Sequence, residues 1–275
     1  MSRAPSPCRS RSVRLPAVEL FGCSGHPGVR PCNAGGDKEV IVLRTARLTI
    51  GAFALAVVLT VTAAPAPVQA AVWTSSDRWG TWSSGGYTLY NNIWGSGHGS
   101  QTIWANSPSN WGVTANHPNT GGIKSYPNAT RYIGRRVSAL GNVTSRFNVT
   151  VPTSGSGLAY TTAYDIWTTD HAHEIMLWMN KYGPVGPLGS FQVRASVGGH
   201  TWDIYRGSNG ANQVYSFIRS GNTNSGTVDV RAIATWIRDR GWFGDVTIGD
   251  VQLGYEITSS AGGRDFVTNS FSVSG

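Results

Sequence analysis

The chain has 275 residues, and its 22 lysines and arginines outnumber its 14 aspartates and glutamates, which gives a formal net charge of +8. Residues 1–70 carry +5 of this charge, and the later basic residues are scattered, with Arg135-Arg136 as their only adjacent pair. Because a nucleic-acid-binding surface needs clustered basic side chains, this distribution argues against a nucleic-acid partner.

The N-terminal part of the sequence has the order of a secretory signal. Residues 48–61 are mostly apolar, follow two arginines, and precede small residues that end at Ala70. This order is typical of a signal peptide, and the run is too short for a typical membrane span. We predict a signal peptide over residues 40–70 and a secreted, extracellular product without a membrane segment. Residues 1–39, rich in arginine, proline, glycine and serine, are predicted to be a non-native or disordered extension.

The positions of the cysteines determine whether the rest of the chain can be stabilised by disulfides. Cys8, Cys23 and Cys32 are the only three, and all precede residue 40. The predicted mature domain, residues 71–275, therefore has no disulfide and no thiol chemistry. About 205 residues are ample for one hydrophobic core, and no linker or internal repeat interrupts them. We predict a single catalytic domain that is a monomer.

Short β-prone runs alternate with glycine-rich turn signals along this domain. Glycine, serine, threonine, asparagine, tryptophan and tyrosine are abundant, as is typical of exported β proteins with sugar-binding surfaces. Regular short strands with such turns indicate an antiparallel sandwich or barrel. The predicted strands cover residues 87–92, 146–151, 160–168, 174–180, 191–197, 201–205, 213–219 and 246–258.

One segment departs from the strand pattern. Residues 229–240 place Val230, Ile233 and Ile237 at helical spacing, with Asp229 or Thr227 available as a cap and a glycine after the end. This pattern predicts one amphipathic α-helix packed on the outside of the sandwich.

Glutamate is rare after residue 70, where nine aspartates but only Glu174 and Glu256 occur. In strand 174–180, side chains alternate between the two faces, so Glu174, Met176 and Trp178 share the face opposite the apolar stripe. Glu256 has the same position on strand 246–258. Two carboxylates on neighbouring strands are the groups that glycoside hydrolysis requires, one ionised and one protonated. The alternative is that both are ordinary surface residues.

Other candidate sites have simpler explanations. Asp170, His171, His173 and Glu174 resemble a metal cluster, but on a strand both histidines would face away from Glu174. No dinucleotide fingerprint or phosphate-binding loop occurs, so we predict neither metal nor cofactor.

Three further residues could support a sugar site. Asn92 and Trp94 would share one strand face, where an indole ring can stack on a sugar and an amide can bind hydroxyls; a core tryptophan beside a turn asparagine is the alternative. Asp165 could hydrogen-bond a nearby carboxylate, or be an edge-strand residue in water.

Seven short runs, taken together and in order, resemble the family 12 glycoside hydrolases, which are small endo-β-1,4-glucanases and xyloglucanases. The runs are 90–95 (YNNIWG), 124–128 (KSYPN), 164–167 (YDIW), 174–180 (EIMLWMN), 183–189 (GPVGPLG), 196–202 (SVGGHTW) and 254–257 (GYEI). The resemblance implies an all-β jelly-roll sandwich of two antiparallel sheets, with a concave substrate cleft and one packed α-helix. It also implies a double-displacement hydrolysis, with retention, of cellulose, mixed-linkage β-glucan or xyloglucan.

The resemblance also assigns roles to particular residues. It implies Glu174 as nucleophile, Glu256 as acid/base and Asp165 as the carboxylate partner of the nucleophile. Asn92 and Trp94 would contact the sugar on the non-reducing side. Met176 would lie beneath the reacting ring, and Pro187 in a loop at the cleft edge.

Two departures from the family bear on its subsites and loops. Many relatives have an aromatic residue two positions after the acid/base, where this chain has Thr258, and many carry disulfides that are absent here. The leaving-group subsites and the early loops are therefore open. Two other functions stay possible at this point: a family 11-like xylanase with the same paired glutamates, and a non-catalytic glucan-binding module. Release of reducing sugar from soluble β-glucan separates an enzyme from a binding module.

Overall fold

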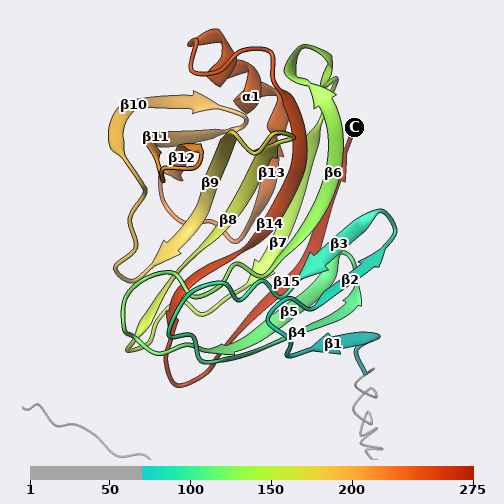
Figure 1. Cartoon of the computed structure of the whole chain (residues 1–275), viewed down its shortest axis with the longest axis vertical. Coiled ribbons are helices and arrows are strands. Elements are labelled where there is room, and N and C mark those ends of the chain that lie inside the picture. The colour runs from blue at the N-terminus through green and yellow to red at the C-terminus, as the bar shows by residue number, and fades with distance from the viewer. Residues whose placement is uncertain (1–69) are drawn as a thin grey trace, which may run out of the picture. The chain divides into compact units, whose positions relative to one another are not determined.

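The computed structural model describes residues 70–275, so the predicted extension and almost all of the predicted signal peptide lie outside the described residues. Within residues 70–275 the chain forms fifteen strands, one α-helix and one short 3-10 helix (Figure 1). The elements are β1 (Trp73–Ser75), β2 (Thr81–Ser84), β3 (Tyr87–Tyr90), β4 (Ser100–Ser107), β5 (Asn110–Asn116), β6 (Asn128–Arg136), η1 (Val137–Ala139), β7 (Thr144–Thr150), β8 (Leu158–Thr168), β9 (His173–Tyr182), β10 (Ser190–Val197), β11 (His200–Ser208), β12 (Gln213–Arg219), β13 (Ser225–Asp229), α1 (Val230–Asp239), β14 (Thr247–Ser260) and β15 (Arg264–Ser274).

The strands form two sheets around one hydrophobic core. The smaller sheet has the order β1-β4-β5-β15-β7-β13, and the larger has the order β10-β11-β12-β9-β8-β14-β6-β3-β2. Strands of the larger sheet curve strongly, with β8, β9 and β14 side by side (Figure 1). The predicted all-β jelly-roll sandwich with one helix is confirmed. Its largest fully buried side chains are Trp111, Trp202, Tyr160, Tyr164, Tyr215 and Tyr255.

One pair of strands departs from the antiparallel pattern. Strands β10, β11 and β12 form an antiparallel meander, but β12 then pairs parallel to β9, with Gln213 opposite His173. Strands β9 and β10 consequently run in the same direction, so residues 183–189 cross over between them instead of forming a tight hairpin.

Side-chain alternation on the central strands follows the sequence prediction. Ile175, Leu177 and Met179 of β9 lie in the core between the sheets, whereas Met176 and Trp178 pack in a smaller cluster on the opposite face. Strand β14 is arranged in the same way, and its core residues are Val251, Leu253, Tyr255 and Ile257. The face of the nine-stranded sheet that turns away from the core therefore carries side chains outside the main core, among them Met176 and Trp178.

The predicted helix is α1, and its ends agree with the sequence signals. The Asp229 side chain caps the start by accepting a hydrogen bond from the backbone N–H of Ala232 at 2.8 Å. Gly241 follows the end with a φ of +67°, a conformation that glycine adopts without steric cost. The helix buries Ile233 and Ile237 against the sandwich. No helix within residues 70–275 is long and apolar enough to cross a membrane.

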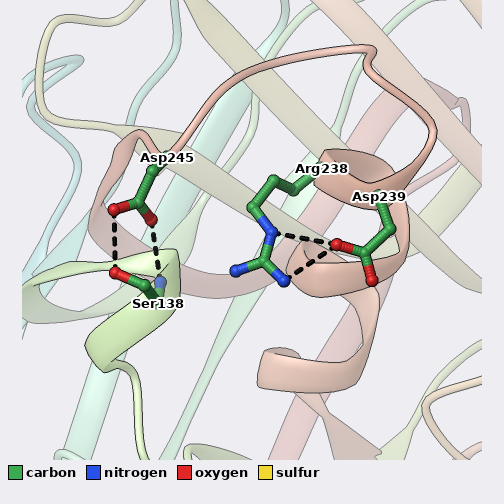
Figure 2. Close-up of polar contacts among 4 residues, drawn as sticks. All are labelled: Ser138, Arg238, Asp239 and Asp245. Atoms are coloured by element: carbon green, nitrogen blue, oxygen red, sulfur yellow. Dashed lines mark hydrogen bonds and ion pairs between the residues drawn. The ribbon is translucent and has the colours of Figure 1, made fainter.

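Polar contacts fasten the chain around α1 (Figure 2). The carboxylate of Asp245, just before β14, accepts hydrogen bonds from the backbone N–H and the hydroxyl of Ser138 at 2.8 and 2.7 Å. Arg238 in the last turn of α1 donates two hydrogen bonds to Asp239. The contact between Asp245 and Ser138 ties η1 to the segment that leads from α1 into β14.

Candidate active site

A cavity of about 790 Å³ lies on the face of the nine-stranded sheet that turns away from the core, and we call it the cleft. All seven residues selected from the sequence line it. They are Asn92, Trp94, Asp165, Glu174, Met176, Pro187 and Glu256. The structure therefore brings together side chains that are as far as 164 positions apart in the sequence.

Three strands supply the three carboxyl groups of the cleft. Glu174 is on β9, Asp165 is on β8 and Glu256 is on β14, and β8 lies between the other two. The prediction that the two glutamates occupy neighbouring strands is wrong, because β14 pairs with β8 and not with β9. Asp165 lies opposite Met176 on one side and Gln252 on the other, so β8 places it between the glutamates.

Glu174 is held by a hydrogen bond that the sequence did not reveal. The side-chain amide of Asn212 donates to Oε2 of Glu174 at 2.8 Å. Asn212 is buried and is itself fixed by Asn209 in the turn before β12. Burial raises the pKa of Glu174, while the hydrogen bonds from Asn212 and Asp165 act in the opposite direction.

Asp165 is the most deeply buried carboxyl group of the three. Burial raises its pKa well above the usual range, and the negative charges of Glu174 and Glu256 raise it further. The protonated form of Asp165 is therefore favoured, and the side chain of Asp165 lies close enough to Glu174 for the two carboxyl groups to influence each other's pKa. A protonated carboxyl group that donates to its neighbour stabilises the ionised form of that neighbour.

Glu256 has an environment suited to a general acid. Burial raises its pKa to about 7, and the charge of Glu174 contributes a smaller part. Burial is the larger cause because β14 places Glu256 deep in the cleft. A carboxyl group with this pKa keeps its proton in mildly acidic solution and can lose it near neutrality.

The raised pKa of Glu256 predicts a pH-dependent cost to stability. The folded state holds the proton more tightly than the unfolded state, so wild type should lose stability as pH rises from about 4.5 through about 7. Glu256→Gln removes this titration, and should be about 3 kcal/mol more stable than wild type at pH 8, with the gain mostly absent at pH 5. Urea unfolding of both proteins at the two pH values measures this. Equal pH dependence in the two proteins would contradict the assignment.

Asn92 and Trp94 line the cleft from a loop and not from a strand. Strand β3 ends at Tyr90, and Asn92 has a φ of +43° that is incompatible with a strand. The Asn92 side chain donates to the carbonyl of Tyr126 at 3.2 Å, and the N–H of Tyr126 donates back to the carbonyl of Asn92. The ring of Trp94 is 45% exposed, so it is open to a ligand and is not a core residue.

The two histidines before Glu174 point in different directions. Strand β9 begins only at His173, which contacts Tyr215 on the core side. His171 precedes the strand in a turn with a φ of +54°, and it lines the cleft together with Glu174. The prediction that both histidines face away from Glu174 is therefore wrong for His171. Within residues 70–275, His, Asp and Glu side chains form no group of three that could hold a metal ion.

The remaining cleft residues lie mainly in the short runs that the sequence analysis singled out, and Ile123, His171, Asn209, Val214 and Gln252 lie outside those runs. Tyr126 and Asn128 belong to the 124–128 run, and Gln252 follows from the alternation of β14. The other lining residues are Tyr90, Ile123, Trp167, His171, Trp178, Gly186, Leu188, Asn209 and Val214. Aromatic rings and amides thus surround the carboxyl groups, as a sugar-binding surface requires.

Paired carboxyl groups with raised pKa values, set in an aromatic cleft of a jelly roll, define a glycoside hydrolase. Residues 85–274 match the sequence model of glycosyl hydrolase family 12, and the chain belongs to this family. The expected family is confirmed, and the alternative of a family 11-like xylanase is wrong.

Individual relatives cover most of the described chain. A probable xyloglucan-specific endo-beta-1,4-glucanase A of Aspergillus terreus is 34% identical over 217 residues, which are 72% of this chain and 86% of that protein. The xyloglucanase domain of NopAA, a type three effector from Sinorhizobium fredii solved in complex with cellobiose, is 40% identical with a TM-score of 0.70, covering 74% of this chain and 98% of that one. A native family 12 xyloglucanase from Bacillus licheniformis is 28% identical with a TM-score of 0.65, covering 74% and 99%.

Proposed function

We propose that this protein is a secreted endo-β-1,4-glucanase that hydrolyses β-glucans with retention of configuration, and that it acts as a monomer without metal or cofactor. The observation that carries the proposal is the set of three carboxyl groups in the cleft, with Asp165 between Glu174 and Glu256. Membership of family 12 and the names of the relatives support the endo-β-1,4-glucanase activity. Residues 71–275 would form the catalytic domain.

In the first step, Glu174 attacks the anomeric carbon while Glu256 gives its proton to the glycosidic oxygen. The bond from the anomeric carbon to that oxygen breaks, and an ester to Glu174 forms. Asp165, which keeps its proton, holds Glu174 in position and in its ionised form. Asn212 supplies a second hydrogen bond to the same carboxylate.

In the second step, water replaces the leaving group. The ester has removed the negative charge of Glu174, so the pKa of Glu256 falls and its carboxylate can accept a proton from water. The water oxygen bonds to the anomeric carbon, and Glu174 leaves as a carboxylate. Two displacements at the same carbon retain its configuration.

Asn212→Ala should shift the pH profile of the reaction. Loss of the hydrogen bond to Oε2 raises the pKa of Glu174, so the acidic limb of kcat/KM should move to higher pH. At pH 5 we expect roughly a tenfold loss, since hydrogen bonds to charged groups contribute about 1.5–3 kcal/mol. The control is Asn222→Ala, which removes an asparagine that bonds the backbone of Lys181 and does not line the cleft. An acidic limb that stays in place would contradict this role of Asn212.

Trp94→Ala should weaken binding of long oligosaccharides more than it slows the chemical step. A stacked ring contributes about 1 kcal/mol, so KM for a cello-oligosaccharide that reaches Trp94 should rise roughly fivefold with little change in kcat. Circular dichroism is the control, because a variant that fails to fold would indicate a structural role for the exposed ring.

The preferred glucan is the next question that an assay can answer. The relatives from Aspergillus terreus and Bacillus licheniformis are named for xyloglucan, and on this basis we propose that xyloglucan is among the substrates. A panel of carboxymethylcellulose, mixed-linkage glucan, xyloglucan and xylan tests the activity and its specificity. Retardation on a glucan-containing gel without release of reducing sugar would instead indicate a binding module.

Secretion is proposed from residues 40–70 alone. Their charged, apolar and small-residue order is that of a signal peptide. N-terminal sequencing of the protein from culture medium should find a chain that begins near Ala71. A chain that retains residues 40–70 in the cell would contradict the proposal.

A further inference from the structure

The turn between β11 and β12 contains the only Asn-Gly pair in the sequence, Asn209-Gly210. Asn209, Gly210 and Ala211 are exposed, and Asn209 also lines the cleft. A Cβ added to Gly210 would meet no atom within 4 Å, so its backbone is open to water. Asparagine deamidates most readily before glycine, because a residue without a Cβ leaves its backbone nitrogen free to attack the preceding side chain. The turn therefore carries a site for chemical modification.

Backbone hydrogen bonds fix the orientation of the Asn209 side chain. The N–H groups of Ala211 and Asn212 donate to Oδ1 of Asn209 at 2.9 and 3.0 Å. Because a backbone N–H can only donate, the oxygen of the Asn209 amide must lie on this side and its nitrogen on the other. That nitrogen donates to Oδ1 of Asn212 at 2.7 Å. Asn209 thus determines which end of the Asn212 amide turns toward it.

The other end of the Asn212 amide reaches the proposed nucleophile. With its oxygen turned toward Asn209, Asn212 directs its nitrogen at Glu174 and donates to Oε2 at 2.8 Å. The two amides form a relay in which each nitrogen donates to the next oxygen, and the last acceptor is a carboxylate. A donor at the end of this relay lowers the pKa of Glu174.

We propose that Asn209 is a deamidation site, and that its modification reverses the relay and lowers activity in acidic solution. This inference rests on the proposed function, in which Glu174 is the nucleophile. The backbone nitrogen of Gly210 bonds to Cγ of Asn209, the bond from Cγ to Nδ2 breaks, and ammonia leaves with the proton of the Gly210 N–H. Water then opens the cyclic imide to aspartate or isoaspartate. The net change consumes water, releases ammonia and replaces the amide by a carboxylate.

The hydrogen bonds of the turn also assist this attack. The N–H groups of Ala211 and Asn212 point at Oδ1 of Asn209, the oxygen on which negative charge develops as Cγ is attacked. Donors already in place at such an oxygen stabilise the charge without reorganisation. The contacts that orient Asn209 for the relay therefore also favour its modification.

A carboxylate at position 209 would have no N–H to offer Asn212. Two oxygens would then face each other, so the Asn212 amide turns over and donates its nitrogen to the new carboxylate. Its oxygen then faces Oε2 of Glu174, where an acceptor has replaced a donor. Glu174 consequently binds a proton more tightly, and less of the enzyme has an ionised nucleophile at acidic pH.

The groups around Glu174 do not offset this change. The titratable side chains that line the cleft beside it are Tyr90, Tyr126, Asp165, His171 and Glu256. A protonated His171 favours the ionised form of Glu174, but it does so equally in the modified and unmodified enzyme. Arg206 is the nearest basic residue along the chain to position 209, and its guanidinium lies over the rings of Tyr215 and Trp242, at 5.8 and 5.6 Å from their centroids.

Asn209→Asp introduces the carboxylate directly. Its matched control is Asn222→Asp, because Asn222 is an exposed asparagine whose side chain bonds the backbone of Lys181. Asn209→Asp should move the acidic limb of kcat/KM on a soluble β-glucan to higher pH, with roughly a tenfold loss at pH 5, since a donor to a charged group is lost. Asn222→Asp should keep the limb of wild type. A limb that stays in place in Asn209→Asp would overturn the proposal.

The double variant Asn209→Asp/Asn212→Ala tests whether the effect passes through the relay. Without the Asn212 amide nothing can be reversed, so the double variant should agree with Asn212→Ala within about twofold at pH 5. A further loss of about tenfold would mean that the carboxylate acts on the cleft directly, and the relay would be wrong.

Wild-type protein held in mildly alkaline buffer tests the modification itself, and decides if Asn209→Asp fails to fold. Peptide mapping by mass spectrometry should find the exchange of NH for O at Asn209 sooner than at Asn222, which threonine follows. The loss of activity at pH 5 should follow the modified fraction. An unmodified Asn209 in a chain modified at Asn222, or a modified enzyme with the wild-type acidic limb, would overturn the proposal. A fresh wild type that hydrolyses no β-glucan defeats the proposed function instead, and the peptide map still detects the modification.

Discussion

Replacement of Glu174 by alanine should abolish hydrolysis of every β-glucan, with kcat lowered by about 10⁴-fold or more. The variant has no group that can bond to the anomeric carbon on the face where Asp165 and Asn212 orient Glu174. Initial rates on soluble glucans measure the loss. Asp203→Ala, which removes a partly exposed carboxylate paired with Arg194 outside the cleft, is the matched control and should leave the rate unchanged.

The stereochemistry of the first product tests the same role independently. Proton NMR during hydrolysis of a cello-oligosaccharide should show the β-anomer first. Retention requires carboxyl groups about 5–5.5 Å apart, whereas inversion requires about 6.5–9.5 Å to admit a water. Azide should not restore the β-product to Glu174→Ala, because it replaces only one of two displacements. An α-anomer appearing first from wild type would mean that Glu174 is not the nucleophile.

Glu256→Ala is expected to lose glucan hydrolysis but to retain slow cleavage of aryl glycosides with good leaving groups. Such a leaving group departs without a proton, so the ester to Glu174 can still form. Azide fits into the space of the missing carboxylate, needs no general base, and should speed turnover to a β-glycosyl azide. Mass spectrometry and NMR of that product measure the effect.

The pH dependence completes the test of Glu256. With a pKa of about 7, wild-type kcat/KM should fall above neutrality as the acid loses its proton. Glu256→Ala should lack this basic limb on aryl glycosides. If the variant keeps the same limb, or if azide has no effect, another group is the acid/base.

Period-two alternation was enough to predict which faces of β9 and β14 turn away from the core. On β9 and β14 the apolar stripes are continuous, so the opposite faces, with Glu174 and Glu256, could be identified before the fold was known. Helix α1 was also predictable, because Asp229 and Gly241 mark its two ends. These signals are local, and each depends on residues within one element.

Strand order could not be read from local patterns. The interposition of β8 between β9 and β14 depends on pairings between segments far apart in the chain, such as Gln252 with Asp165. The hydrogen bond from Asn212 to Glu174 spans 38 positions for the same reason. His171 was misplaced because a single left-handed residue reverses the direction that a strand would give its side chain.

Several strands of the six-stranded sheet were not predicted at all. Strands β4, β5 and β15 contain many asparagines, serines and threonines, which are equally typical of turns. Their strand conformation is fixed by pairing with one another, as in the contact of Phe266 with Val113 across β15 and β5. Tertiary pairing therefore overrode weak local preferences.

The place of β14 has a consequence for biosynthesis. This strand is contributed by residues 247–260, near the C-terminal end, yet it lies in the middle of the nine-stranded sheet, between β8 and β6. Until β14 is inserted, the nine-stranded sheet consists of two separate parts with exposed edges. The part β10-β11-β12-β9-β8 carries Glu174, and the part β6-β3-β2 lies next to Asn92. Those edges can pair with other chains, so we expect a polypeptide that stops before residue 247, and therefore lacks Glu256, to be inactive and prone to aggregate. Enzymatic activity is thus a direct report that the last part of the chain has folded.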